Sequence, residues 1–323
     1  MTTSIAIGCL VQWYEIEILS EYIDTLLDAV NEYDKDSITI DIKFSINQDL
    51  EKIDKEDRLI YILSRFDDQV NRLENFKTNL IIENDLVTIA DYRREFNNYY
   101  CDKVDILVWG ETDMLVPKQM FNIIHGIHSQ VSSSTPKYLL TFGINKMWDS
   151  SWKVIEHPSF TCKEHSDNPN DWWGVRYVTS QQEMNRINES VTDLDIVNIS
   201  PFKFNGCGLV IASEVVKAGA NIPKAAFFVH EDTAFLLMLQ KLFGNIPQYH
   251  AKNIYLPHNR KHLNKRAFIK GETDMDKSNI GLLRKSHHWY VKGNQFSEEN
   301  CYNLFNPTYK AKTWKDVFNE DSQ

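Results

Sequence analysis

The sequence lacks the features that mark membrane-spanning, exported and disulfide-bonded proteins. Its 323 residues contain no apolar run of about 18 residues, so no transmembrane segment is expected. The first 17 residues carry no basic side chain and only a short apolar run, which predicts a first strand rather than a signal peptide. The 5 cysteines are scattered and form no Cys-x-x-Cys pair, which favours reduced thiols in the cytoplasm and gives a zinc site no support.

Positive charge is also in short supply. The chain has 35 Lys and Arg against 45 Asp and Glu, for a net charge of -10, which disfavours nonspecific nucleic-acid binding. One local basic patch, NRKHLNKR at residues 259–266, is the exception. Hydrophobic residues make up 42% of the chain and charged residues 25%, which indicates a globular protein with one large core or two modest ones.

The stretch VDILVWGETDMLVP, from Val104 to Pro117, is the centre of the sequence. Its apolar run predicts a buried strand that ends at Gly110 and is followed at once by Glu111 and Asp113. Open α/β sheets bind ligands at the carboxyl ends of their strands. Carboxylate oxygens there suit Mg²⁺ or Mn²⁺ carrying a diphosphate. The alternative is a solvated acidic turn.

Strand and helix patterns alternate around this stretch. Alternating or continuous apolar residues predict strands, and apolar residues three and four apart predict helices. The chain opens with a strand, a helix and a strand, which is a βαβ unit with a parallel pair of strands. Strands are predicted at residues 4–11, 38–46, 80–82 and 138–142, and helices at 15–31, 50–79, 88–100 and 119–130.

The second half of the chain changes character. Residues 143–200 are rich in Trp, Asn, Asp and Ser and predict a loop-rich insertion with one helix at 180–190, and such long segments are usually functional. Trp172 and Trp173 are candidates for an acceptor-binding platform, since sugar faces and bases stack on indoles. The alternative is that they attach the insertion to the core.

Core character returns at residues 204–212. An apolar helix then follows His230, Glu231 and Asp232 and stops at Gly244, and a short strand at 253–256 leads into His258. Acids in the first turn of a helix complement its dipole, so a purely structural role for Glu231 and Asp232 is the alternative to a chemical one.

The order of these parts resembles the GT-A type nucleotide-sugar glycosyltransferases, particularly their family 2-like group. The opening IAIGCLVQWYEIEILSEYIDTLLDAV is similar to that family's first strand and helix. YRREFNN before DILVWGETDMLVP is similar to the segment that leads into the DxD strand. FNGCGLVIASEVVKAGANI, followed by FFVHEDTAFLLMLQKLFG, is similar to the acceptor-side glycines and the helix that carries an acidic pair.

This resemblance implies a mixed, mostly parallel α/β sheet of the GT-A (Rossmann-like) type, flanked by helices. The domain would span residues 1–260, with a nucleotide-sugar half at 1–130 and an acceptor half at 131–260 that contains the insertion at 143–200. Residues 261–323 would form a C-terminal extension, whose Lys285, His287 and His288 are candidates to close over the nucleotide.

The resemblance also implies roles for single residues. Asp113 matches the last Asp of the DxD motif, the expected metal ligand, and Glu111 stands where the family has an Asp that faces the ribose or a metal-bound water. His258 matches a histidine that completes the metal site in some relatives, with His262 as the competing choice. Asp232 matches the catalytic base, and Glu231 lies beside it.

Other matches concern the nucleotide sugar. Asn47 falls near the Asp that reads the nucleotide base in relatives, and this departure leaves the nucleotide open. Arg94, together with Arg93, is a candidate for the diphosphate. Gly206 and Gly208 would let the backbone approach the donor sugar, with a tight strand turn as the alternative.

The function that follows from the resemblance is metal-dependent, inverting transfer of a sugar, as in a hexosyltransferase. The expected cofactor is Mn²⁺ or Mg²⁺, the expected donor is a nucleotide-diphosphate sugar, most simply a UDP-sugar, and the acceptor is a hydroxyl of a glycan precursor. A DNA base is a minor alternative acceptor, through the basic patch and the Trp pair. Two further alternatives keep the fold: a sugar nucleotidyltransferase, disfavoured by the lack of glycine and lysine in QWYE at 12–15, and a non-catalytic carbohydrate-binding protein.

Overall fold

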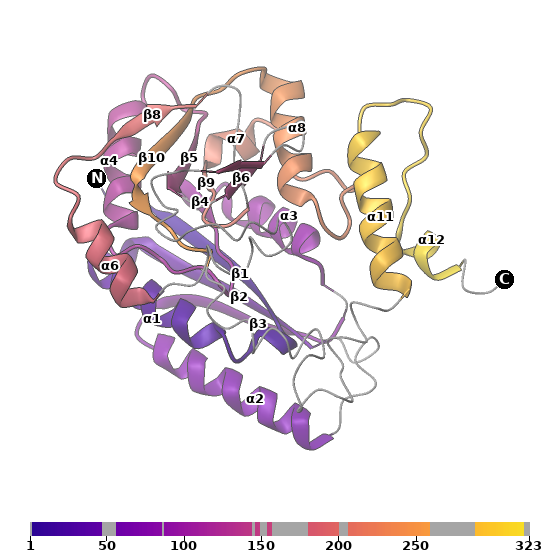
Figure 1. The fold of residues 1–323 in the computed structure, drawn as a ribbon, viewed down its shortest axis with the longest axis horizontal. Helices are drawn as coiled ribbons and strands as arrows, with labels where there is room; N and C mark the ends of the chain where they lie inside the picture. Colours follow the sequence, from indigo (N-terminus) through magenta and orange to yellow (C-terminus); the bar gives the residue numbers. More distant parts are fainter. Residues whose placement is uncertain are drawn as a thin grey trace, which may run out of the picture.

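The computed structural model describes residues 2–46, 56–85, 87–143, 146–148, 154–156, 180–199, 206–258 and 288–319. In these ranges the chain forms an eight-stranded sheet with helices on both faces (Figure 1). Among the same residues, no helix combines the length and the apolar character that crossing a membrane requires.

The sheet has the strand order β3-β2-β1-β4-β9-β5-β10-β8. Strand β1 is parallel to β2 and β4, β2 is parallel to β3, and β5 is parallel to β10. Strand β9 runs antiparallel between β4 and β5, and β8 is antiparallel to β10. The predicted mixed, mostly parallel sheet is therefore confirmed. Its strands are β1 Ile5–Gln12, β2 Ile38–Ser45, β3 Lys77–Glu83, β4 Ile106–Trp109, β5 Leu139–Gly143, β8 Ile196–Asn198, β9 Val210–Ala212 and β10 Gln248–Tyr255, and β6 Lys146–Trp148 pairs separately with β7 Val154–Glu156.

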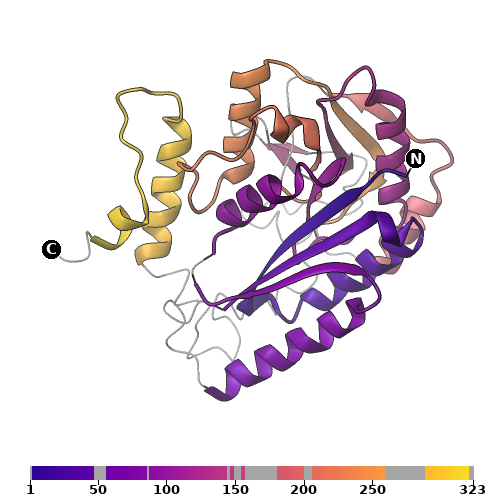
Figure 2. The same ribbon diagram turned by 180° about the vertical axis from the view of Figure 1, so that it is seen from behind.

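Helices cover both faces of the sheet (Figures 1 and 2). Helix α1 contacts α2 and α4 on one face, and α3 contacts α7 on the other. Helix α1 buries the apolar stripe that its sequence predicts, including Tyr22, Ile23 and Leu26. The helices are α1 Leu19–Asn31, α2 Glu56–Val70, α3 Ile89–Tyr100, α4 Met120–Val131, α6 Gln181–Glu189, α7 Ser213–Lys217, α8 Glu231–Phe243, α11 His288–Tyr302 and α12 Trp314–Asn319, with short 3₁₀ helices η1 Trp13–Glu15, η2 Lys35–Ser37 and η3 Asn71–Leu73.

The strand order at the centre of the sheet indicates where a ligand would bind. From β1 the chain builds outward through β2 and β3, and then returns to β4 on the opposite side of β1. This reversal of strand order falls between β1 and β4, and open α/β sheets bind ligands at the carboxyl ends of the strands at such a point. The Gly110 amide donates to the Gly8 carbonyl at 2.7 Å, which joins the residue after β4 to the middle of β1. Glu111 and Asp113 follow this junction.

The predicted helix at residues 50–79 is wrong at its C-terminal end. Helix α2 ends at Val70, and strand β3 already begins at Lys77. Strand β3 lies at the edge of the sheet, where Leu80, Ile81 and Ile82 keep 39%, 36% and 48% of their surface exposed. A half-exposed edge strand does not need the alternating or fully apolar pattern that marks buried strands, so its sequence gives a weak signal.

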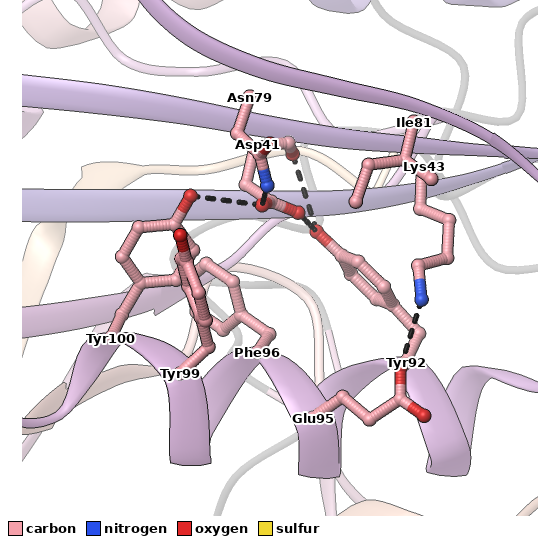
Figure 3. Close-up of a pocket in the computed structure, with 9 residues that line it drawn as sticks. All are labelled: Asp41, Lys43, Asn79, Ile81, Tyr92, Glu95, Phe96, Tyr99 and Tyr100. Carbon is pink, nitrogen blue, oxygen red and sulfur yellow. Dashed lines mark hydrogen bonds and ion pairs between the residues drawn. The ribbon is translucent and has the colours of Figure 1, made fainter.

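Helix α3 is fixed to the sheet through a carboxylate of β2. Asp41 is buried and accepts hydrogen bonds from the hydroxyls of Tyr92, at 2.7 Å, and Tyr100, at 3.0 Å, both on α3. Asn79 of β3 donates to the same carboxylate at 2.6 Å. The four side chains line a pocket of about 230 Å³ under the helix (Figure 3). Losing a donor would leave a buried charge poorly satisfied, so these bonds hold the helix in one orientation.

The N-cap of α3 provides a test of how this helix is stabilised. Thr88 is the N-cap of the helix: its hydroxyl accepts from the Asp91 amide at 3.1 Å and lies 2.9 Å from the Phe227 carbonyl, to which it donates. We expect Thr88→Ala to lower the free energy of unfolding by about 1–2 kcal/mol, measured by urea denaturation. Thr88→Ser keeps both hydrogen bonds and should stay close to the wild type. An alanine variant as stable as the wild type would contradict the role of the cap.

Candidate functional site

Two carboxylates and one imidazole meet at the carboxyl edge of the sheet. Residues Met114 and His258 form an isolated antiparallel bridge, which brings the end of β10 beside the segment that follows β4. His258 Nε2 lies 2.9 Å from Asp113 Oδ2 and 3.1 Å from Glu111 Oε2. His258, far away in the sequence, is thus brought to Glu111 and Asp113, the other two predicted metal ligands.

The donor set of this cluster fits a metal ion. A single ring nitrogen carries at most one hydrogen, so His258 can give a full hydrogen bond to only one of the two carboxylates at a time. A cation held by Nε2 and by an oxygen of Glu111 and of Asp113 would satisfy all three groups at once. Oxygen and imidazole nitrogen ligands of this kind suit Mn²⁺ and neighbouring divalent ions.

The charges in the cluster depend on one another. Burial by itself lowers the pKa of His258, but the carboxylates of Asp113 and Glu111 outweigh it and raise the pKa above its ordinary value. Burial by itself raises the pKa of Glu111, but His258 and Arg93 reverse the effect and lower it to about 2. Glu111 is therefore ionised throughout the physiological range, as a metal ligand must be.

A buried guanidinium links this cluster to the start of α8. Arg93 of α3 is almost fully buried, with its side chain 1% exposed. Its Nη2 contacts Glu111 Oε1 at 2.7 Å, and its Nη1 contacts Glu231 Oε1 at 2.5 Å. The same Nη2 also donates to the Gly206 carbonyl at 3.0 Å, and the guanidinium lies 4.7 Å from the centre of the Trp109 ring. Arg93 thus holds one oxygen of Glu111 while the other oxygen faces His258.

The two acids of α8 follow an unusual backbone turn. His230, the N-cap of α8, has φ 65° and ψ 23°, and it is the one non-glycine residue with positive φ in the described part of the chain. This left-handed conformation costs about 1–2 kcal/mol and persists where surrounding contacts enforce it. Helix α11 supplies such contacts: Ser297 Oγ donates to the Val229 carbonyl at 2.6 Å, and Cys301 Sγ donates to the His230 carbonyl at 3.6 Å.

Burial shifts both acids toward their protonated forms. It raises the pKa of Glu231 to about 7, against the opposing charge of Arg93. It also raises the pKa of Asp232, against the hydrogen bond that its Oδ1 accepts from the Thr233 amide at 2.7 Å. Together with Glu111 and Asp113, these side chains carry more negative charge than Arg93 and His258 can neutralise. That excess is a second reason for a cation at this edge.

A Gly-Cys-Gly turn forms the third side of the site. The Gly208 amide donates to the Trp109 carbonyl at 2.8 Å, which attaches the turn to the end of β4. Gly208 has φ 72°, as expected for the predicted alternative of a tight strand turn. Cys207 Sγ, a carboxylate oxygen of Glu111 and a ring nitrogen of His258 all lie within 4.8 Å of one another.

Gly206 lies against the guanidinium of Arg93. A Cβ atom at this position would lie 2.1 Å from Arg93 Nη1, so the glycine makes room for the guanidinium. The predicted approach of the backbone to a donor sugar at Gly206 stays a prediction.

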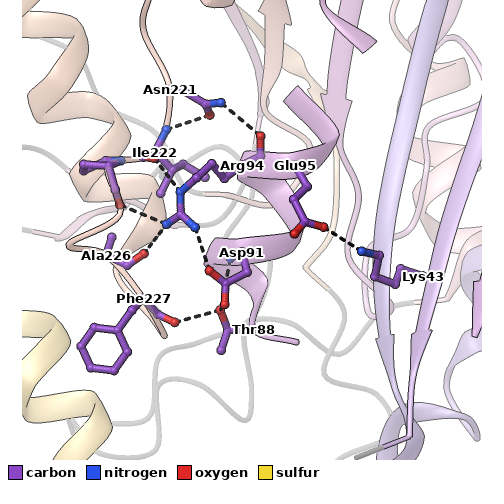
Figure 4. A network of polar contacts seen from close by, with 10 residues as sticks. Lys43, Thr88, Asp91, Arg94, Glu95, Asn221, Ile222, Ala226 and Phe227 are labelled. Carbon is purple, nitrogen blue, oxygen red and sulfur yellow. Dashed lines mark hydrogen bonds and ion pairs between the residues drawn. The ribbon is translucent and has the colours of Figure 1, made fainter. Parts of the chain in front are cut away.

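Arg94, a predicted contact of the diphosphate, lies against a loop of the backbone. Its guanidinium donates to the carbonyls of Ile222, Pro223 and Ala226 and pairs with Asp91 at 2.7 Å (Figure 4). These contacts attach α3 to the loop that leads into α8. The two neighbouring arginines of α3 therefore make different contacts: Arg93 binds the acids of the site, and Arg94 binds the loop behind it.

Several predicted residues lie outside the described part of the chain. They are Asn47, Trp172, Trp173, His262, Lys285, His287 and the basic patch at 259–266. His288 begins α11, but its side chain is not described either. The roles given to these residues stay predictions.

The central place of Arg93 and the position of Cys207 were not predicted. A signal for Arg93 was present: it occupies the buried stripe of α3 with Phe96, Asn97 and Tyr100, where a charged residue requires a buried partner. For Cys207 the sequence offered only a scattered cysteine, and no role at a site was predicted for it.

This chain was compared with protein-family models, curated proteins and solved structures. No protein-family model matches the chain, and no curated protein matches it. Solved structures are similar to it at low identity. One is a mannosyltransferase, PcManGT from Pyrobaculum calidifontis in complex with GDP-Man and Mn²⁺, at 11% identity and a TM-score of 0.47, covering 96% of this chain and 78% of that one.

Two further solved structures are similar to this chain. GalNAc-T7 with UDP, GalNAc and Mn²⁺ has 9% identity and a TM-score of 0.48, over 99% of this chain and 54% of that one. TarS of S. aureus has 14% identity and a TM-score of 0.37, over 97% and 76%. At these identities and scores the likenesses assign no activity to this chain.

Gly206 provides a test of the site's construction. We expect Gly206→Ala to displace Arg93 and leave Glu111 and Glu231 without their cation, which should lower the free energy of unfolding by about 3 kcal/mol. Gly126→Ala is the matched control, because no heavy atom lies within 4 Å of its added Cβ and alanine favours the helix α4. Urea denaturation of both variants measures the difference. Equal stability of the two variants would show that Arg93 does not depend on the glycine.

Proposed function

We propose that the protein is a metal-dependent, inverting glycosyltransferase of the GT-A type that uses a nucleotide-diphosphate sugar as donor. The observation that supports this most directly is the meeting of Glu111, Asp113 and His258 at the carboxyl edge, joined through Arg93 to the acids of α8. A metal-type cluster and a pair of buried acids, joined through Arg93, are the two halves of the chemistry that sugar transfer requires.

Glu111, Asp113 and His258 are the residues that would hold Mn²⁺ or Mg²⁺. A bound divalent cation would neutralise the charge that develops on the leaving nucleoside diphosphate. Arg93 keeps Glu111 oriented by occupying Oε1, so that Oε2 faces His258. The guanidinium therefore preorganises the ligand set instead of binding the diphosphate itself.

Asp232 is the residue we assign as general base for the acceptor hydroxyl. Glu231 is held by Arg93 at 2.5 Å, which makes it a positioning residue rather than a proton acceptor. Asp232 Oδ1 accepts hydrogen bonds from the Thr233 amide, at 2.7 Å, and from the Thr233 hydroxyl, at 3.5 Å, and we assign the proton transfer to its other oxygen. The dipole of α8 by itself would weaken the base, but burial raises the pKa of Asp232 and so strengthens it. Direct displacement with such a base inverts the anomeric carbon.

We also propose a class of donor and a class of acceptor. A UDP-sugar is the simplest donor to test first, with GDP-sugars as the comparison. The acceptor we propose is a hydroxyl of a glycan or glycan precursor. The resemblance to the family 2-like group supports both choices.

Two amide substitutions separate the roles of the acids. We expect Asp113→Asn and Asp232→Asn each to abolish sugar transfer while leaving the fold intact, since neither changes side-chain size. Only Asp113→Asn should weaken metal-dependent nucleotide binding, because only Asp113 belongs to the metal cluster. Asp67→Asn, at an exposed position of α2, is the matched control for both.

Thermal unfolding with a panel of nucleotide sugars, with and without Mn²⁺, measures binding before any acceptor is known. A donor present at 100 times its Kd should stabilise the wild type by about 2.7 kcal/mol. The Asp232→Asn variant should keep this shift, and Asp113→Asn should lose it. Wild-type turnover by either variant would refute its assigned role. Release of pyrophosphate from a nucleoside triphosphate would point to a nucleotidyltransferase.

A further inference from the structure

We propose that Cys207 is an additional ligand of the metal site, and that its sulfur gives the site a preference for Co²⁺ and Zn²⁺ over Mg²⁺. This inference rests on the proposed function, because it concerns the same cluster of Glu111, Asp113 and His258. It goes further by assigning a soft donor to a site whose expected ligands are oxygen and nitrogen.

The geometry supports Cys207 as a member of the cluster. Its Sγ, an oxygen of Glu111 and a nitrogen of His258 lie within 4.8 Å of one another, and ligand atoms on one ion are separated by such distances. The residue is buried, with 6% of its surface exposed, so its sulfur is enclosed by the site rather than by solvent. Three chain segments contribute: the end of β4, the end of β10 and the turn at 206–208.

The surrounding turn fixes the position of the sulfur. On one side, the Gly206 carbonyl accepts a hydrogen bond from Arg93 at 3.0 Å. On the other side, the Gly208 amide donates to the Trp109 carbonyl, and the Trp109 amide donates to the Leu209 carbonyl at 2.9 Å. The backbone on both sides of Cys207 is therefore held against the same groups that position Glu111. A thiol that only filled a gap in the core would not require this attachment.

The chemistry of a thiolate ligand sets the metal preference. On binding, the Cys207 S–H bond breaks, the proton leaves to solvent, and the sulfur lone pair forms the bond to the metal. Thiolates favour soft and borderline ions, whereas Mg²⁺ prefers oxygen ligands in octahedral geometry. Along the series Mg²⁺, Mn²⁺, Co²⁺ and Zn²⁺, the contribution of Cys207 to binding should therefore increase.

Cobalt provides a test that does not depend on activity. We expect titration of the full-length protein with Co²⁺ to produce visible d–d absorption together with a thiolate-to-cobalt charge-transfer band in the near ultraviolet. In Cys207→Ser the charge-transfer band should disappear while d–d absorption remains, and the affinity for Co²⁺ and Zn²⁺ should fall by at least about tenfold. The affinity for Mg²⁺ should change by less than about twofold, because sulfur contributes little to its binding.

The matched control is Cys101→Ser, because Cys101 is also buried but lies at the end of α3 and donates to the Asn98 carbonyl. It should keep both absorption features and the wild-type affinities. Cys207→Ala serves as a second variant in case the serine variant does not fold, and the wild-type spectrum itself needs no substitution.

The outcomes separate this inference from the proposed function. Cobalt binding with d–d absorption but without a charge-transfer band in the wild type would overturn the role of Cys207 and leave the metal site in place. A band that persists in Cys207→Ser would assign the sulfur to another cysteine and overturn the inference as well. Failure of the wild type to bind Co²⁺, Mn²⁺ or Zn²⁺ at all would contradict both the inference and the metal-dependent function.

Discussion

The ion pairs of Arg93 are the interaction on which the rest of the site depends. One buried guanidinium joins Glu111, after β4, to Glu231, at the start of α8, across more than a hundred residues of sequence. Removing one partner from such a buried network leaves an uncompensated charge, which is among the costliest changes a fold can suffer. Two other features keep the guanidinium of Arg93 in place. Gly206 leaves space for it, and Asp41 holds helix α3, which carries Arg93. Charge pairing therefore fixes the geometry of the edge before any ligand binds.

The C-terminal helix α11 supports the start of α8, which carries Glu231. The sequence predicts a GT-A domain that ends at residue 260, yet α11 lies against the turn that precedes α8 (Figure 1). Ser297 and Cys301 contact the backbone of Val229 and His230, and Phe296 packs with Phe227 and Phe228. These contacts support a left-handed residue whose conformation aims Glu231 and Asp232. A segment that resembles an extension is thus part of the support for the acids, as strained backbone requires.

The sequence predicted the sheet and the acidic edge, but not the contacts that organise them. The strand before Glu111 and Asp113 was predictable because four successive buried residues form a continuous apolar run. The place of Asp232 and His258 followed from a family resemblance. By contrast, Arg93 and Arg94 are adjacent and differ by about 100° around the helix, so only tertiary packing decides which one enters the site. The same holds for Cys207, whose partners come from distant segments, and for β3, whose edge position weakens its pattern.

We propose that Glu111, Asp113 and His258 bind one divalent ion on the side of the site that faces Asp232. A crystal structure of the protein with Mn²⁺ and a nucleoside diphosphate, with anomalous diffraction to locate the metal, tests this most directly. The account predicts one strong anomalous peak bonded to an oxygen of Glu111 or Asp113 and to His258 Nε2, with the diphosphate beside it. A peak elsewhere on the molecule, with these three side chains still bonded only to one another, would contradict it.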